Sequence, residues 1–220
     1  MKRIYCISGL GADERIFSKL KIAGVELKYL QWFTPEKNES IDSYAKRMSL
    51  QIDDENPVLM GVSFGGMMAV EIAKHIPAQK IILLSSIKSH KEMPRWMKLC
   101  GQLKLNKIAP ARRPFKWMAG FENNFLGTQS KEEENLANEF RQTIDPIYLH
   151  WAIATIINWK NEIVPSNIFQ IHGTNDKTFP IKNIRPTHII YNAGHFMVMN
   201  RADEISLLIG EIINSFANGR

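Results

Sequence analysis

The stretch Gly61-Val62-Ser63-Phe64-Gly65 lies between a short apolar run and an apolar helical pattern. This context predicts a strand, a sharp turn with Ser63 at its apex, and a helix. A serine in such a turn takes a positive φ, and the residues two before and two after it must lack side chains, because strand and helix pass closely. Gly61 and Gly65 meet this requirement. We therefore expect Ser63 Oγ to reach solvent beside a helix N-terminus, where it can act as a nucleophile.

Strand-like and helical segments alternate along most of the 220 residues. Six apolar segments predict strands: 4–8, 25–33, 58–62, 80–85, 168–172 and 187–191. Four segments with helical spacing lie between or after them: 14–20, 40–52, 64–75 and 202–216. This alternation predicts an α/β fold, a mostly parallel, doubly wound sheet of about six strands with helices on both faces.

Residues 87–161 differ from the rest of the chain in sequence pattern, since they contain no convincing strand and hold four of the five tryptophans. Helical patterns are clearest over 132–143 and 146–158. We interpret 87–161 as a helical cap inserted into a core formed by 1–86 and 162–220. Within it, the proline and basic residues of 110–120 suggest an exposed segment beside the entrance to a pocket.

The composition excludes several classes of protein, among them membrane-spanning and disulfide-rich secreted proteins. An apolar share of 45% is sufficient for one sizeable core, and no run reaches the length of a membrane span. The N-terminal apolar run is too short for a signal peptide, and Cys6 and Cys100 form no disulfide framework. We therefore expect a cytoplasmic protein without a membrane partner.

The net charge of +6 raises the question of nucleic-acid binding. Basic residues are densest over 88–116, but this segment carries no recognised nucleic-acid motif. A solvated helical face is the favoured interpretation, and attraction of anionic substrates to a pocket entrance is an alternative. We expect no nucleic-acid partner.

Three polar residues each follow a predicted strand: Ser63, Asp176 and His195. Carboxyl ends of parallel strands meet at one edge of a sheet, so these side chains are expected to lie together. There His195 would take the proton of Ser63 Oγ, and Asp176 would orient the imidazole. The alternatives are a turn aspartate and an ordinary loop histidine. His172, at the end of the strand that precedes Asp176, is more typical of a packed histidine than of a second base.

An acyl-transfer site also needs donors for an oxyanion. The backbone N–H of Phe64 is one candidate, and the N–H of Leu10, in the glycine loop after the first strand, is the other. Apolar side chains expected to line the substrate pocket are Met67, Trp117, Trp151 and Phe196, although packing within the cap is the alternative for the tryptophans. No metal-ligand spacing or dinucleotide motif is present, so we expect no metal and no cofactor.

Three motifs together resemble the α/β-hydrolase superfamily: Gly61-Val62-Ser63-Phe64-Gly65-Gly66, His172-Gly173-Thr174-Asn175-Asp176 and Asn192-Ala193-Gly194-His195-Phe196. The resemblance covers the chain except the cap, and it implies the fold, a serine–aspartate–histidine triad and a leaning towards ester hydrolysis. The sequence departs from the family in two ways. The usual first two antiparallel strands are missing, and Ser8-Gly9 stands where His-Gly is usual.

These features predict hydrolysis of a small carboxylic ester or thioester through an acyl-Ser63 intermediate, with a small-molecule acyl substrate as the partner. The same residues are also compatible with cleavage of a C–C bond or an amide, or with acyl transfer, because the fold does not decide the electrophile. A non-catalytic ligand-binding sensor that uses the pocket is the alternative from another class. The sequence leaves the substrate and the oligomeric state open.

Overall fold

The computed structural model describes residues 1–103 and 119–215, with the side chains of 119–122 left out. Six strands form one open sheet in the order β2-β1-β3-β4-β5-β6, and every pairing is parallel. The strands are β1 (Lys2–Ile7), β2 (Val25–Tyr29), β3 (Val58–Val62), β4 (Lys80–Leu84), β5 (Ile168–Gly173) and β6 (His188–Ile190). The predicted parallel α/β sheet is confirmed.

The strand order places a topological switch point at the centre of the sheet. The chain runs from β1 to β2 on one side and then returns to β3 on the other side of β1. Connections from β1 and β3 therefore leave the carboxyl edge in opposite directions and open a crevice between them, which is where such sheets bind ligands.

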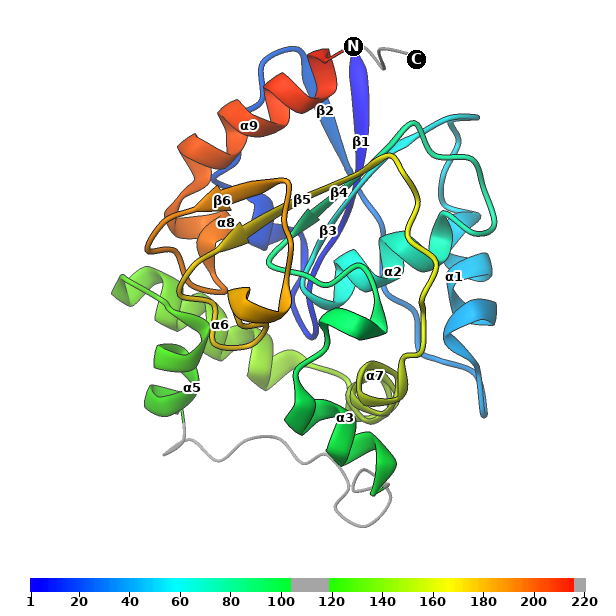
Figure 1. The fold of residues 1–220 in the computed structure, drawn as a ribbon, viewed down its shortest axis with the longest axis vertical. Coiled ribbons are helices and arrows are strands. Elements are labelled where there is room, and N and C mark those ends of the chain that lie inside the picture. Colours follow the sequence, from blue (N-terminus) through cyan, green and yellow to red (C-terminus); the bar gives the residue numbers. More distant parts are fainter. Residues whose placement is uncertain (104–118, 216–220) are drawn as a thin grey trace.

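Helices cover both faces of the sheet (Figure 1). On one face lie α1 (Ile41–Ser49) and α2 (Phe64–Ile72), which share an apolar core that includes Tyr44, Met48 and Met68. On the other face lie η1 (Glu14–Phe17), α8 (Met197–Asn200) and α9 (Ala202–Asn214), around Ile205 and Ile209. The all-buried residues of β3 and β4 fit their central positions between these two layers.

Within the described residues, the segment between β4 and β5 contains helices joined by loops and no strand. It contains η2 (His90–Glu92), α3 (Arg95–Gln102), α5 (Ala119–Leu126), α6 (Lys131–Thr143) and α7 (Pro146–Asn158). Figure 1 shows these helices gathered at the carboxyl edge of the sheet, below the ends of β1 and β3. Local sequence defines their starts, since Ser130 caps α6 through the Glu133 N–H, and Asp145 caps α7 through the Tyr148 N–H.

Element boundaries differ from the sequence expectations in a few places. The helix expected over 14–20 is only the 3₁₀ turn η1, and α2 ends at Ile72 because Pro77 follows closely. The short helix α8 was not predicted, and η4 (Ile181–Asn183) adds a turn between β5 and β6. Trp117 and most of the segment 110–120 lie outside the described residues. Over the described ranges, no helix is long and apolar enough to cross a membrane.

Candidate active site

Ser63 occupies the turn between the last residue of β3 and the first residue of α2. Its backbone has φ 54° and ψ −119°, a region that residues with side chains seldom adopt. The Ser63 N–H donates to Leu84 O at 3.0 Å, and Ser63 O accepts from the Gly66 N–H at 3.0 Å and from Ser86 Oγ at 2.6 Å. These bonds hold the strained turn in place at the carboxyl edge of the sheet.

Close backbone approach explains the two predicted glycines. A Cβ on Gly61 would lie 2.2 Å from the carbonyl oxygen of Gly65, so strand and helix pass too closely for a side chain. A Cβ on Gly65 would lie 2.2 Å from the carbonyl oxygen of Ile7, at the end of β1. Both glycines therefore permit the turn sterically, and Gly65 also lets α2 approach the neighbouring strand.

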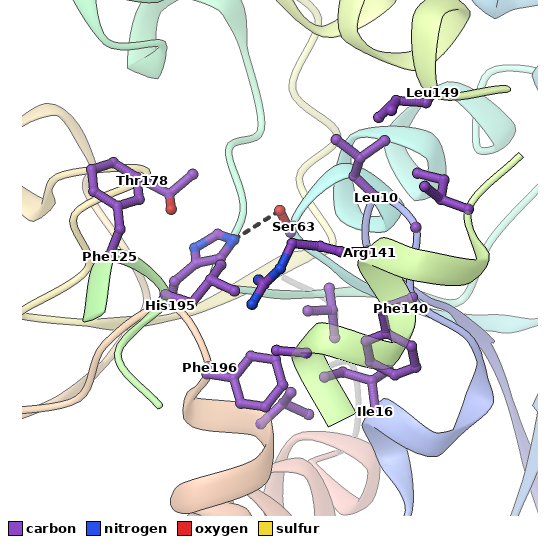
Figure 2. A pocket seen from close by; sticks show the side chains of 18 of the residues that line it. Leu10, Ile16, Ser63, Phe125, Phe140, Arg141, Leu149, Thr178, His195 and Phe196 are labelled. Carbon is purple, nitrogen blue, oxygen red and sulfur yellow. Dashed lines mark hydrogen bonds between the residues drawn. The ribbon is translucent and has the colours of Figure 1, made fainter. Parts of the chain in front are cut away.

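Ser63, His195 and Asp176 form a continuous hydrogen-bonded chain. His195 Nε2 lies 2.9 Å from Ser63 Oγ, and His195 Nδ1 lies 2.8 Å from Asp176 Oδ2 (Figure 2 shows the first of these bonds). An ionised carboxylate only accepts, so Nδ1 carries the proton and Nε2 is left to accept the hydroxyl proton of Ser63. The ring of Phe179 packs edge-on against the imidazole at 5.7 Å and restricts its rotation.

The environment of Asp176 keeps it ionised. Burial alone raises the pKa of this carboxyl, but its interactions with His195 and His172 and the hydrogen bond from the Phe179 N–H together hold it below the ordinary value. The second oxygen, Oδ1, accepts from the backbone N–H groups of Thr178 at 2.8 Å and Phe179 at 2.9 Å. Asp176 is only 3% exposed, so these donors replace water almost completely.

His172 is fully buried beside Asp176. Its Nε2 lies 2.8 Å from Phe179 O and 3.4 Å from Asp176 Oδ2, so the proton is on Nε2. Burial lowers the pKa of His172, and the nearby carboxylate offsets this only in part, which favours the neutral imidazole. This arrangement is that of a packed histidine, as the sequence suggested.

Two backbone N–H groups are available beside Ser63. The loop of Gly9, Leu10 and Gly11 follows β1, and a Cβ on Gly9 would lie 3.4 Å from Ser63 Cβ. Within the described residues, neither the Leu10 N–H nor the Phe64 N–H donates to a backbone carbonyl. Phe64 is also the first residue of α2, where the helix dipole favours negative charge. Both positions are compatible with an oxyanion site.

A cavity of about 550 Å³ opens in front of Ser63 and His195. Its lining is mostly apolar and comes both from the sheet edge and from α5, α6 and α7 (Figure 2). The larger apolar lining residues are Leu10, Ile16, Phe125, Leu126, Phe140, Ile144, Leu149, Ile153 and Phe196. The inserted helices therefore form one wall of the space into which the Ser63 hydroxyl faces.

The predicted pocket residues are only partly brought together. Phe196 lines the cavity, whereas Met67 and Trp151 do not. Met67 is fully buried because it follows Ser63 on the inner face of α2, and Trp151 stacks on Tyr44 at 4.3 Å on the other side of α7. The side chain of Phe64 is also buried and lies outside the lining. Helical phase separates these side chains from the cavity, and single apolar residues in a sequence do not reveal that phase relative to a site.

Sequence reasoning did not identify the wall formed by α6. Phe140 lies there, and Arg141 extends its guanidinium towards the space in front of Ser63 (Figure 2). Arg141 Nη2 donates to Asn138 Oδ1 at 2.6 Å and to Asn123 Oδ1. One signal was available, since an arginine one residue after a buried aromatic position of an amphipathic helix points towards the edge of its apolar face.

The described residues contain no group of three or more histidine, cysteine or carboxylate side chains that could hold a metal ion. The polar atoms at the cavity instead belong to Ser63, His195, Arg141 and Thr178. Together with the two N–H groups above, they bring a serine hydroxyl, a hydrogen-bonded imidazole and backbone N–H donors to one space. This arrangement can carry out acyl transfer.

No protein-family model matches the sequence, and no curated protein resembles it in sequence. Solved structures do resemble it in fold. An esterase from Exiguobacterium antarcticum superimposes with a TM-score of 0.70 at 12% identity, over 97% of this chain and 92% of that chain.

Two further structures extend the comparison. The meta-cleavage product hydrolase CumD from Pseudomonas fluorescens has a TM-score of 0.66 at 17% identity, over 97% of this chain and 91% of that one. MenH from S. aureus has a TM-score of 0.68 at 17% identity, over 96% and 93%. With the parallel sheet and the serine turn, this likeness shows that the chain has the α/β-hydrolase fold.

Proposed function

We propose that the protein is a serine hydrolase that cleaves a carboxylic ester or thioester of a small molecule through an acyl-Ser63 intermediate. The observation that carries this proposal is the chain of hydrogen bonds from Ser63 through His195 to Asp176, at the mouth of an apolar cavity. A serine hydroxyl bonded to a neutral, oriented imidazole is the arrangement that activates a nucleophile.

The proposed reaction has two halves, and in each half His195 acts first as a base and then as an acid. His195 Nε2 takes the proton of Ser63 Oγ as the oxygen attacks the acyl carbon, and the carbonyl oxygen becomes an oxyanion facing the Leu10 and Phe64 N–H groups. His195 then donates the proton to the leaving alcohol or thiol, and the acyl group stays on Ser63. Water repeats these steps, with His195 as the base, and releases the carboxylic acid.

The cavity suggests the chemical class of the acyl group. Its volume lies within the range of small-molecule sites, and its wall is formed largely by leucine, isoleucine and phenylalanine. An apolar acyl chain gains free energy by leaving water there, whereas a polar one would leave hydrogen bonds unmade. We therefore propose a substrate with an apolar acyl group.

The similar structures support hydrolysis, but they leave open which type of bond is cleaved. One similar structure is named an esterase and another a meta-cleavage product hydrolase. Cleavage of a C–C bond by the same three residues is therefore the second candidate, and it differs from the first only in the electrophile that the pocket presents.

A burst assay tests the proposal. Wild type and Ser63→Ala are mixed with p-nitrophenyl esters of graded chain length, and the release of p-nitrophenol is followed before and during steady state. We expect a burst of one equivalent in wild type only, an acyl group on Ser63 in the mass of the intact protein, and an optimum at a chain length that fills the cavity. Turnover that persists in Ser63→Ala would contradict the mechanism.

A wild-type protein without burst or turnover on any ester argues against the ester proposal. The same pair of proteins is then tested with acyl thioesters and with a 1,3-diketone, in which the leaving carbanion is stabilised as an enolate and takes up the proton from His195. Cleavage of the diketone by wild type alone would favour the second candidate. Ligand binding without any cleavage, unchanged in Ser63→Ala, would instead favour a sensor.

A further inference from the structure

We propose that Trp32 is a positioning residue that holds both oxyanion donors in register, one through a hydrogen bond and the other through ring stacking. This inference rests on the proposed function, because it concerns how the Leu10 and Phe64 N–H groups are aligned with the oxyanion. Trp32 lies in the connection between β2 and α1, far in sequence from Ser63.

The first contact concerns the loop that carries Leu10. Ser8 Oγ lies 2.6 Å from Ala12 O, and the Ala12 N–H donates to Gly9 O at 3.1 Å. The loop is thus closed by one backbone bond and by one bond from the Ser8 side chain. Leu10 lies inside this closed turn, so the direction of its N–H depends on the closure.

Trp32 completes the closure. Its Nε1 lies 2.9 Å from Ser8 Oγ. An indole nitrogen only donates, so Ser8 Oγ accepts from Trp32 and its own proton is directed to Ala12 O. Ser8 is 5% exposed, and this bond therefore selects one rotamer of the hydroxyl with little competition from water.

The second contact concerns Phe64. The rings of Trp32 and Phe64 stack, with centroids 5.2 Å apart and planes inclined by 8°. Phe64 follows Ser63 directly, and its backbone N–H is the donor at the start of α2. Stacking against a fixed indole restrains the Phe64 side chain, which in turn restrains the backbone at that position.

The indole is itself held from outside the loop. Tyr44 of α1 packs against it at 6.0 Å, and Tyr148 of α7 packs at 5.3 Å. One side chain therefore contacts the loop after β1 and the residue after the nucleophile, which come from opposite sides of the switch point. The hydrogen bond between Trp32 and Ser8 also gives a physical role to Ser8, which stands where the α/β-hydrolase pattern usually has histidine.

The test compares three single variants. Trp32→Phe keeps an aromatic ring but removes the N–H, and Ser8→Ala removes the hydroxyl at the other end of the same bond. Tyr44→Phe is the matched control, because it belongs to the same aromatic cluster and loses hydrogen bonds to Phe33 but none to the loop. Each is assayed for kcat and KM, for thermal stability, and for inhibition by an alkyl boronic acid, whose tetrahedral adduct on the serine engages the oxyanion site.

We expect Trp32→Phe and Ser8→Ala each to lower kcat by about 10- to 100-fold, a part of the loss that follows removal of an oxyanion donor. Boronic acid affinity should fall with kcat, while KM stays within about threefold, because the ground state does not carry the oxyanion charge. A double variant that combines Trp32→Phe with Ser8→Ala should lose little more than the worse single variant, since both changes interrupt one chain of bonds. Tyr44→Phe should retain kcat.

The outcomes separate this inference from the proposed function. Absence of a Ser63-dependent burst in wild type contradicts the proposed function itself. A normal wild-type burst with unchanged kcat and unchanged boronic acid affinity in Trp32→Phe overturns the role of Trp32 alone. Equal losses in Tyr44→Phe would also overturn it, because they would mark general damage to the cluster. If Trp32→Phe does not fold, Ser8→Ala decides between the same two results.

Discussion

His172 and His195 face the same carboxylate oxygen of Asp176, at 3.4 Å and 2.8 Å respectively. The two imidazoles nevertheless differ in what they can do. His195 reaches Ser63 with its second nitrogen, whereas the second nitrogen of His172, Nδ1, is buried without a hydrogen-bond partner within the described residues. Protonating His172 would leave a buried N–H unpaired, so this histidine resists the charge that His195 must accept in the proposed reaction.

This difference predicts how stability depends on pH. The pKa of His172 in the folded protein lies below the unfolded value of about 6.5. Above that pH the His172 imidazole is neutral in both the folded and the unfolded chain, so its protonation does not reduce the free energy of unfolding. As the pH falls below about 6.5, the unfolded chain takes up a proton that the folded chain refuses, and the free energy of unfolding decreases. We expect urea titrations between about pH 8 and pH 5 to show this slope, and His172→Gln to reduce it. An equal slope in the variant would contradict the assignment.

Asp176 adds a second loss at lower pH. The pKa of Asp176 in the folded protein is also depressed, so its contribution to stability is present above the unfolded value of about 3.9 and is lost as the pH falls through the folded value.

Replacing Asp176 by asparagine should lower kcat by about 10⁴-fold, because the amide can accept on one side only and cannot stabilise an imidazolium. Steady-state kinetics with circular dichroism as the folding control checks this. Activity within tenfold of wild type would argue against the role of the carboxylate.

The steric demand at the serine turn predicts a large effect from a single methyl group. In Gly65→Ala the new Cβ meets the carbonyl oxygens of Ile7 at 2.2 Å and Ser8 at 2.3 Å, and neither is a flexible side chain. We expect a loss of about 2–3 kcal/mol in the free energy of unfolding. Gly210→Ala is the control, since Gly210 lies within α9 with nothing within 4 Å of the added atom. It should be stabilised by about 0.5–1 kcal/mol, and equal effects at both positions would refute the steric argument.

The cavity wall predicts a change in chain-length preference. Ile153 on α7 lines the cavity and is half-buried, so Ile153→Trp should fill space without forcing the core apart. The ester chain-length optimum should shift to shorter acyl groups, with kcat/KM for the longest substrates lowered about tenfold or more. Ile147→Trp tests the same chemistry on the same helix at a site that is 61% exposed and outside the lining. A parallel shift in both variants would mean that the cavity does not hold the acyl chain.

The sequence alone determined the features that depend on local geometry. The strand, glycine turn and helix around Ser63 follow from sterics within five residues, because no other residue type fits at Gly61 or Gly65. The alternation of strands and helices was sufficient to predict the parallel sheet, and the ends of three strands were sufficient to predict that Ser63, Asp176 and His195 meet. These inferences need only the rule that parallel strands share a carboxyl edge.

The tertiary structure decided what depends on the direction of side chains between distant elements. Trp151 and Met67 turned away from the cavity, and Phe140 and Arg141 of α6 turned towards it, because helix rotation follows from packing over the whole face. Trp32 gave no signal in sequence, since its contacts with Ser8 and Phe64 join loops from different strands. A local pattern carries its own turn geometry, whereas the partner of an aromatic ring is determined only when the sheet brings separate segments together.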